Sequence, residues 1–304
     1  MRRVLALTYS QTGQLTDILD SVLTPLRDND EIELDIVQIE PEQPFPFPWP
    51  FVKFFRIFPE TVAMQPIALK PITPKYAEYD LVILSYQVWF LSPSLPISSF
   101  LQSEQGQELI SNTPVVTLIG CRGMWLMAQE KVKQLLKQAN AKLVDNIALI
   151  DECGSAFSFL ATPLWMFTGR KKPYSWVPKA GVSEKEIKDA SRFGQAIKQR
   201  LLADSTKIDS PMLAGLSAVK INEKLIASER VGNHSFSIWS KLLRKLGPQQ
   251  SKRRVIGLSV YVTFLLTLIL TVVPITALIK KLIAPLTAKK IAKQKSYYAQ
   301  PSGE

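Results

Sequence analysis

The residues best suited to binding chemistry lie near the N-terminus, in a short polar loop between an apolar run and an amphipathic segment. The loop reads Ser10-Gln11-Thr12-Gly13-Gln14-Leu15-Thr16. A phosphate group needs several donors that converge on one point. Consecutive backbone N–H groups at a helix N-terminus, with Ser and Thr hydroxyls added, supply them without a cation. Gly13 allows close backbone approach, so the loop predicts a phosphate site, although hydroxyl residues also cap ordinary helices.

The segments on either side of this loop are typical of a strand and a helix. Residues 4–9 are an apolar run of strand length. Apolar residues then recur at helical spacing from Leu15 to Leu26, and Pro25 together with the turn at 28–30 ends the predicted helix. A second strand at 32–39 completes a β-α-β unit. Because such a crossover is right-handed, the loop is expected at the carboxyl edge of a parallel sheet, where open α/β sheets bind ligands.

Strands and helices continue to alternate along the chain. Apolar runs at 80–85, 113–120 and 141–150 predict buried strands, and residues 124–139 predict a helix. Residues 183–202 predict another helix, opened by the capping box Ser183-Glu184-Lys185-Glu186. The alternation predicts an α/β fold with a doubly wound, mostly parallel sheet over residues 1–202. Two aromatic-rich insertions, at 41–74 and 155–178, interrupt it.

The loops after the predicted strands carry a resemblance to a known family. Tyr9-Ser10-Gln11-Thr12-Gly13 resembles the phosphate loop of flavodoxin-like FMN proteins, and residues 80–96 resemble their third strand and flavin loop. The resemblance implies a flavodoxin-like domain that binds FMN. It also implies flavin contacts at Gln87, Val88, Trp89, Phe90, Cys121, Arg122, Gly123 and Trp125. One departure is that Leu15 stands at the family's usual second hydroxyl position after the glycine, and Thr16 follows one residue later.

A narrower resemblance combines the phosphate loop with three other features. These are Pro44-Phe45-Pro46-Phe47-Pro48-Trp49, Gly120-Cys121-Arg122-Gly123-Met124-Trp125 and an apolar C-terminal tail. Together they resemble dialkylresorcinol condensing enzymes, which are encoded beside ketosynthases. That implies a redox step on a long-chain cyclic diketone or resorcinol precursor, with a ketosynthase as a candidate partner. Carbon–carbon condensation fits poorly, because it needs an activated cysteine with histidine partners, and the single histidine, His234, lies outside the predicted α/β domain.

The predicted site needs no catalytic dyad. A flavin supplies the hydride and electron chemistry while the protein positions and tunes it, and NADH or NADPH is a candidate donor. Arg122 is a candidate to stabilise a reduced flavin or an anionic substrate, or else a solvated loop residue. Trp89, Trp125 and Cys121 are also open to interpretation as packing residues. Cys121 and Cys153 are the only cysteines and lack metal-ligand spacing, so no metal site is predicted.

Charge and hydropathy place the last third of the chain at a membrane. The net charge of +11 is uneven: residues 1–200 hold 21 basic and 21 acidic residues, whereas residues 201–304 hold 16 and 5. Residues 255–279 carry no charge, and at 1.5 Å per residue they span about 37 Å, enough to cross a hydrocarbon core of about 30 Å. We therefore expect a basic amphipathic linker at 203–250, a transmembrane segment at 251–282 and a basic tail at 283–304. This pattern favours membrane lipid over nucleic acid as the partner.

The sequence leaves the orientation of this segment open. Six basic residues precede the span and six follow it, beginning with Lys280 and Lys281, so the positive-inside rule ties. A re-entrant segment kinked at Pro274, with both ends cytoplasmic, is the alternative to a single crossing. Residues 235–246 predict an interfacial helix or a linker helix packed on the main domain. The N-terminal apolar run is too short for a signal-peptide core, so the main domain is expected in the cytoplasm, attached to a bacterial inner membrane.

Taken together, the sequence predicts a membrane-attached, FMN-dependent oxidoreductase that acts on a hydrophobic substrate, such as a dialkylresorcinol- or quinone-like compound. A flavodoxin-like electron-transfer protein and a flavin-free module that recruits a ketosynthase are the alternatives. Electron carriers of this fold are usually acidic around the flavin, so the balanced charge of residues 1–200 favours an enzyme. The two insertions are expected to form an apolar lid or channel between flavin and bilayer, or else to cover a sheet face or a homo-oligomer contact.

Overall fold

The computed structural model of the protein describes residues 1–151, 153, 155–203 and 208–303. Within it, the side chains of residues 155–159, 273–274, 277–281 and 283–284 are not described. The side chains of Pro274, where a kink is predicted, and of the flanking Lys280 and Lys281 therefore lie outside the described part.

A parallel sheet forms the centre of the molecule, with the strand order β2-β1-β3-β5-β6. Its strands are β1 (Arg2–Thr8), β2 (Ile32–Gln38), β3 (Leu81–Trp89), β5 (Pro114–Cys121) and β6 (Lys142–Ile150). All four pairings are parallel, and β4 (Ser92–Pro93) folds back antiparallel on the end of β3. From β1 the chain first builds outward to β2 and then to the other side through β3, so the sheet has its switch point between β1 and β3.

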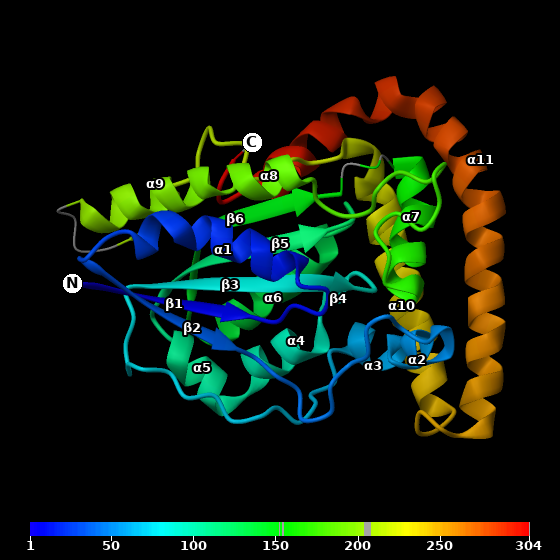
Figure 1. The fold of residues 1–304 in the computed structure, drawn as a ribbon. Helices are drawn as coiled ribbons and strands as arrows, with labels where there is room; N and C mark the ends of the chain where they lie inside the picture. The colour runs from blue at the N-terminus through cyan, green and yellow to red at the C-terminus, as the bar shows by residue number, and fades with distance from the viewer. Residues whose placement is uncertain (152, 154, 204–207, 304) are drawn as a thin grey trace.

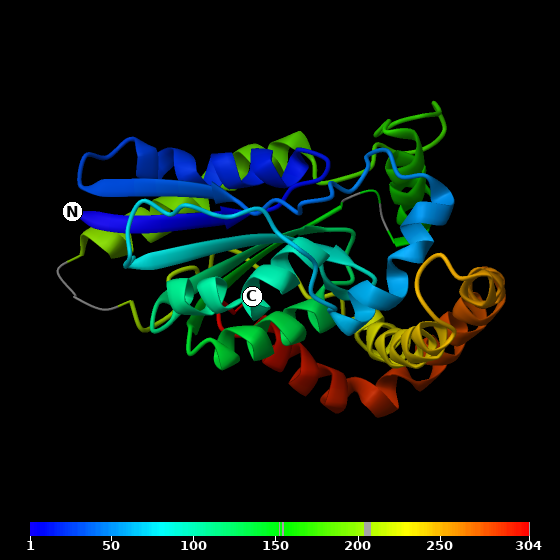
Figure 2. The same cartoon turned by 90° about the horizontal axis from the view of Figure 1, so that it is seen from below.

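Helices cover both faces of the sheet, as Figures 1 and 2 show. One face carries α1 (Gln14–Arg27), α8 (Glu184–Asp189) and α9 (Ser191–Leu202), and the other carries α4 (Leu95–Gln102), α5 (Glu104–Ile110) and α6 (Leu126–Gln138). Side chains alternate across β1, so that Val4 and Ala6 enter the core beneath α1 whereas Leu5 and Leu7 enter the core beneath α6. Burial on both faces explains why the strands are continuous apolar runs.

The predicted strands and helices of residues 1–150 are confirmed, with small differences at their ends. The helix predicted at 183–202 is divided into α8 and α9 around Ala190. The second of these packs closely on α1, because a Cβ at Gly194 would overlap the carbonyl oxygen of Val22. The glycine therefore allows this helix to lie against its neighbour, an approach that a larger residue would block.

The two insertions meet at the carboxyl edge of the sheet. The first has no helix through residues 42–50, as its prolines predict, and then forms α2 (Phe51–Arg56) and α3 (Phe58–Ala63). The second forms α7 (Ser155–Thr168). The backbone N–H of Trp49 donates to the carbonyl of Met166 at 2.8 Å, and the rings of Phe47 and Trp165 lie edge to face with centroids 6.3 Å apart. The insertions thus form one packed unit.

The chain beyond residue 202 adds further packing to the α/β body. Leu213 and Ala218 are fully buried in the core beneath α1. Helix α10 (Glu223–Lys245) then packs on α3 and α6, and the hydroxyl of Ser240 donates to the carbonyl of Pro59 at 2.6 Å. The segment predicted as an interfacial or a packed linker helix belongs to this longer, packed helix, because its apolar face finds partners within the chain.

Helix α11 (Lys252–Ala299) is the last element and runs for 48 residues. Figure 1 shows it beside α10, then curving past the sheet edge and back towards β6. Its Lys252–Val272 segment is long and apolar enough to cross a membrane by length and composition: an 18-residue stretch of it has a mean hydropathy of 2.4, and 11% of that stretch is buried. The expected tail at 283–304 continues this helix to Ala299 rather than leaving the body as a separate segment.

Candidate functional site

The structure brings the three predicted loops together at the carboxyl edge of the sheet. We call them the β1 loop (residues 9–13), the β3 loop (residues 87–91) and the β5 loop (residues 120–125). They follow three adjacent parallel strands. The rings of Tyr9 and Trp89 lie 5.9 Å apart between centroids, which joins the first two loops. The edge therefore has the geometry in which open α/β sheets bind ligands.

The β1 loop carries donors that the protein does not use. Within the described residues, none of the four backbone N–H groups at positions 10–13 has a recorded hydrogen-bond acceptor. The hydroxyls of Thr8 and Ser10 are buried and also have no partner. Gly13 adopts a left-handed φ of 81°, and a Cβ there would meet no atom within 4 Å. Because buried polar groups rarely stay unpaired, the loop has unfilled capacity for an oxyanion at the N-terminus of α1.

Two glutamine side chains of the predicted site are engaged by the protein. Gln11 donates from Nε2 to the carbonyl of Pro46 at 2.8 Å and accepts from the indole N–H of Trp49 at 2.9 Å. Gln14 accepts from the backbone N–H of Val182 at 3.1 Å and donates to the carbonyl of the same residue at 3.3 Å. Both side chains therefore fasten neighbouring segments to the β1 loop instead of pointing free amides at a ligand.

The remaining side chains of this segment differ in burial. Leu15 is 2% exposed and packs in the core beneath α1, so its side chain lies away from the loop. The backbone N–H of Gln14 lies 3.4 Å from the hydroxyl oxygen of Thr12. Thr16, in the first turn of α1, is half-buried. Threonine hydroxyls thus remain near the open end of the helix although the expected second hydroxyl position holds a core leucine.

The β3 loop combines one unpartnered polar atom with aromatic packing. The side-chain oxygen of Gln87 is buried and has no partner, and Val88 packs against the core beneath α6. Trp89 is 8% exposed, with the rings of Phe45 and Trp49 edge-on at 5.1 Å and 5.8 Å. Most of the Trp89 ring is therefore already covered by the first insertion.

Phe90 lies among the aromatic rings of the first insertion. Its left-handed φ of 49° turns the chain back into β4, and its ring lies 4.6 Å from Phe54 and 5.2 Å from Phe58 between centroids. The side chain joins the phenylalanine cluster of α2 and α3. The sequence predicts a flavin contact at this position, and the turn directs the ring towards the first insertion.

The β5 loop is half-buried as far as Met124 and ends at the buried Trp125. Burial raises the pKa of the Cys121 thiol to about 12, so it stays protonated at neutral pH. Burial also lowers the pKa of Arg122, and the charge of Asp151 opposes that effect. Gly123 has a φ of 132°. Trp125 is 1% exposed within the core beneath α6, so its ring packs against protein side chains at a position where the sequence predicted a flavin contact.

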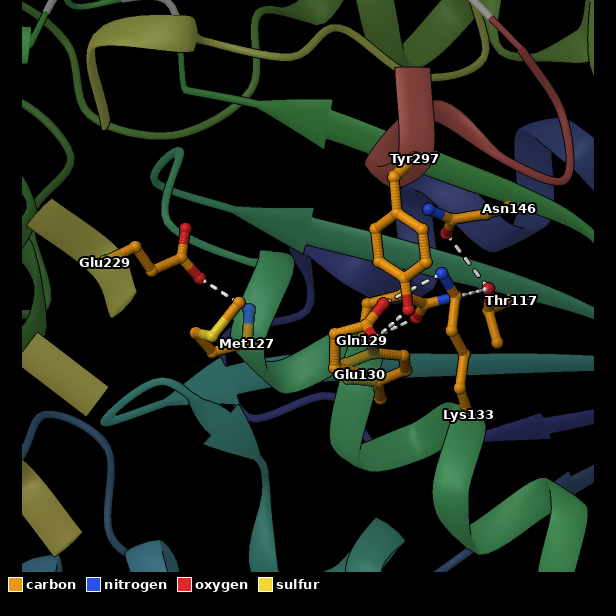
Figure 3. Close-up of polar contacts among 9 residues, drawn as sticks. Thr117, Met127, Gln129, Glu130, Lys133, Asn146, Glu229 and Tyr297 are labelled. Atoms are coloured by element: carbon orange, nitrogen blue, oxygen red, sulfur yellow. Dashed lines mark hydrogen bonds and ion pairs between the residues drawn. The ribbon is translucent and has the colours of Figure 1, made fainter. Parts of the chain in front are cut away.

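A buried carboxylate occupies the N-terminus of α6. Glu229 of α10 is fully buried and accepts from the backbone N–H of Met127 at 2.7 Å, as Figure 3 shows. Burial raises the pKa of Glu229 to about 7, opposed by the hydrogen bonds from Met127 and Leu126. The chain thus supplies its own carboxyl group as a hydrogen-bond acceptor at this helix end.

A polar chain crosses the sheet face beside this carboxylate. The hydroxyl of Tyr86 donates to the side-chain oxygen of Gln129 at 2.5 Å, and the amide nitrogen of Gln129 donates to Thr117 at 2.9 Å. Thr117 in turn donates to the side-chain oxygen of Asn146 at 2.9 Å, as Figure 3 shows. These bonds satisfy polar groups that would otherwise be buried without partners.

Sequence reasoning missed three polar residues near this edge, which are Asp151, Lys131 and the Glu229 described above. Asp151 accepts from the backbone N–H of Gly181 at 3.0 Å and from the hydroxyl of Thr162 at 3.1 Å, and so ties the second insertion to the end of β6. Lys131 donates to the hydroxyl of Ser92 at 2.7 Å, and burial lowers its pKa to about 8. Asp151 follows a predicted strand directly, which was an available signal, whereas nothing near Glu229 indicates its role.

Comparison with known proteins gives similarity at the level of architecture. No protein-family model matches the chain, and the comparison with curated proteins found no match. Among solved structures, a flavoprotein in complex with FMN from Lactobacillus acidophilus NCFM is 16% identical, with 49% of this chain and 93% of that chain covered and a TM-score of 0.38. A flavodoxin from the domain Archaea is 7% identical, with 66% and 98% covered and a TM-score of 0.37. An oxidoreductase from Corynebacterium diphtheriae is 12% identical, with 67% and 99% covered and a TM-score of 0.33.

The strand order defines the architecture of the sheet without reference to these comparisons. The sheet has flavodoxin-like topology. At such low identities and TM-scores, similarity by itself assigns neither a ligand nor an activity. The ligand must be argued from the loops, and among them the β1 loop offers the clearest unfilled binding capacity.

Proposed function

We propose that this protein is a membrane-attached flavoprotein that binds FMN at the carboxyl edge of its sheet and catalyses a redox reaction on a hydrophobic substrate. One observation carries the proposal. The β1 loop, at the switch point of a flavodoxin-like sheet, presents four consecutive unpaired backbone N–H groups at the N-terminus of α1. An oxyanion such as the FMN phosphate would supply acceptors for these N–H groups.

The residues present fit such a group. The backbone of residues 10–13 and the hydroxyls of Ser10 and Thr12 would hold the phosphate, and the unpartnered oxygen of Gln87 would accept from the flavin. The β5 loop with Arg122 would line the other side, as the family resemblance implies. Bound FMN would supply hydride and electron chemistry, and the protein would shield and tune it. Solved structures of similar architecture include one with FMN bound, which supports this choice of ligand.

A continuous row of aromatic rings supports the hydrophobic substrate and the membrane location. It starts at Trp89 and ends at α11. The rings follow in the order Trp89, Trp49, Phe54, Phe90, Phe58 and Tyr261. The centroids of successive rings are 5.8, 5.7, 4.6, 5.2 and 4.3 Å apart. The row connects the ligand edge to the candidate membrane helix. These rings are in contact with one another, which suits a lid that must separate to admit substrate better than a permanently open channel.

The alternatives make different demands on the same site. An electron-transfer flavoprotein needs the flavin edge accessible to a protein partner, whereas the aromatic insertions cover this edge. A flavin-free module that recruits a ketosynthase gives no role to the unpaired β1 loop. A dialkylresorcinol precursor remains our candidate substrate, with NADH or NADPH as donor, on the strength of the sequence resemblance.

The purified protein's visible spectrum tests the proposal. We expect absorbance near 450 nm, roughly one FMN per chain, and bleaching under anaerobic NADH or NADPH followed by recovery with a hydrophobic acceptor. Protein that contains no flavin and binds none when FMN is added would refute the cofactor assignment. Flavin that is reduced but re-oxidised only by an electron-carrier protein would favour the electron-transfer alternative.

A further inference from the structure

Both ends of α11 are bonded to the same α/β body. At the beginning of the helix, Arg254 is 4% exposed and its guanidinium lies 2.6 Å from each carboxylate oxygen of Glu60 in α3. About two helical turns later, Tyr261 stacks on Phe58 with a centroid separation of 4.3 Å. Breaking a buried ion pair leaves an uncompensated charge, so this end is firmly held.

The other end of the helix is held by contacts on the opposite side of the body. The hydroxyl of Tyr297 donates to Glu130 of α6 at 2.7 Å, as Figure 3 shows. Just beyond the helix, Ser302 is 1% exposed. Its hydroxyl accepts from the backbone N–H of Asn146 in β6 at 2.6 Å and donates to the carbonyl of the same residue at 2.9 Å. Tyr298 is also buried. The C-terminal segment is thus fixed to the sheet.

The stretch between these two anchors exposes a long apolar surface. Its most exposed large side chains belong to Leu270, Leu282 and Leu286, at 75%, 73% and 87% exposure. Soluble proteins rarely expose apolar surface on this scale, and a membrane is one environment that removes its cost. Other exposed apolar residues on α11 are Ile256, Val260, Phe264, Leu266, Val272 and Ile275.

Cationic residues border this surface at both ends. Lys252 and Arg253 are exposed where α11 begins, and Lys289, Lys290 and Lys293 are exposed where it returns. Cations at both ends of an exposed apolar stretch are suited to the headgroups of an anionic lipid surface. The charge pattern therefore favours an anionic bilayer as the occupant of the apolar surface.

A single membrane crossing conflicts with these contacts. It would place a hydrocarbon core of about 30 Å between the two ends of α11. The Arg254–Glu60 and Ser302–Asn146 contacts would then have to lie on opposite sides of the membrane, although Glu60 and Asn146 belong to one packed body. We propose that α11 lies along one leaflet of an anionic bilayer as an in-plane helix, with both of its ends on the cytoplasmic side. This inference rests on the membrane attachment proposed above.

Protease access to the two termini tests the arrangement in the full-length protein. One cleavable tag precedes Met1 and another follows Glu304. In inverted inner-membrane vesicles we expect both tags to be cleaved to the same extent, and in intact spheroplasts we expect both to be protected. Cleavage of the C-terminal tag alone in spheroplasts would show a single crossing and overturn the proposal. Because the flavin spectrum is recorded on the same preparation, a crossing helix with FMN retained would leave the proposed function standing.

Vesicle flotation tests the choice of occupant. Phosphatidylethanolamine vesicles with about 30% phosphatidylglycerol should bind the protein, and charge reversal by K252E together with R253E should weaken binding at least about tenfold. The matched control is K185E with K188E. These two lysines are exposed on α8, which lies on the same face of the sheet as α1, and their charge reversal should leave vesicle binding unchanged. If the protein does not bind the vesicles and forms a discrete oligomer without detergent, the apolar surface is buried against a second copy. That result would show that the proposal is wrong.

Discussion

Two helix N-termini lie at the same edge of the sheet, and only one of them is filled from within the chain. At α6 the carboxylate of Glu229 accepts from the backbone N–H of Met127. At α1 the four N–H groups of residues 10–13 have no recorded acceptor among the described residues. Both helix ends carry the same partial positive charge. The comparison shows that the N-terminus of α6 is occupied by a side chain of the protein, whereas the N-terminus of α1 keeps free hydrogen-bonding capacity within the described residues.

The aromatic residues divide in a similar way. Trp125 at the start of α6 is enclosed by the core, whereas Trp89 lies at the boundary between the β1 loop and the first insertion. Both tryptophans follow strands in the sequence. Position near the end of a strand therefore does not distinguish a tryptophan enclosed by the core from one at the boundary of the β1 loop. Substitutions on the filled α6 side should therefore change stability, whereas substitutions on the open α1 side should change ligand binding.

The largest expected effect is on the filled side, at Trp125. Replacing it with alanine removes a fully buried ring and should lower the free energy of unfolding by about 3–5 kcal/mol. Denaturant unfolding monitored by circular dichroism measures this. Trp176→Ala is the control, because that side chain is 64% exposed and should change stability little. Unchanged stability with lost flavin in Trp125→Ala would show that the ring is a ligand contact after all.

The next effect is the pH dependence contributed by Glu229. Because burial raises its pKa from 4.5 to about 7, the folded protein holds this proton more tightly than the unfolded chain does. Stability should therefore fall as pH rises from about 4.5 to about 7, by about 3 kcal/mol in total. Glu229→Gln should remove this part of the dependence, measured by thermal unfolding at several pH values. Exposed Glu108→Gln should retain it, and identical curves for the two variants would contradict the buried-carboxylate account.

On the open side, Gly13→Val should weaken FMN binding about 100-fold or more, equivalent to about 2.7 kcal/mol, while the fold persists. A branched side chain here obstructs the backbone approach to the phosphate. Flavin titration measures the change. Gly215→Val is the matched control, since Gly215 also has a positive φ, 79°, and open space around a Cβ, but it lies outside the three loops. Equal flavin loss in both variants would assign the effect to backbone strain.

The smallest expected effect is at Ser10. Its hydroxyl is buried without a protein partner, so Ser10→Ala should leave the stability of the flavin-free protein unchanged or slightly raise it. FMN affinity should fall about fivefold, because one hydrogen bond to the phosphate, worth about 1 kcal/mol, is lost. Paired melts with and without FMN distinguish the two quantities. A stability loss in the flavin-free protein with no change in affinity would mean that the hydroxyl serves the fold.

Local spacing was enough to predict much of the α/β body. The apolar runs of β1 and β3, the helical repeat from Leu15 to Leu26 and the polar loop between them each depend on residues within one or two turns or strand lengths. The carboxyl-edge location of that loop then follows from the handedness of β-α-β crossovers. The long apolar run near the C-terminus is visible for the same reason, because hydropathy is a property of neighbouring residues.

Only the tertiary structure decided which of these features are still free to act. Glu229 reaches Met127 across 102 positions and Ser302 reaches Asn146 across 156, and no local pattern encodes either meeting. Whether a helix end is open, whether a tryptophan is covered and whether both ends of α11 share one side of a membrane all depend on how distant segments pack. The sequence determined the secondary structure and the polar composition of the β1 loop because those depend on neighbouring residues. The tertiary structure decided its availability because burial and pairing are long-range properties of the folded chain.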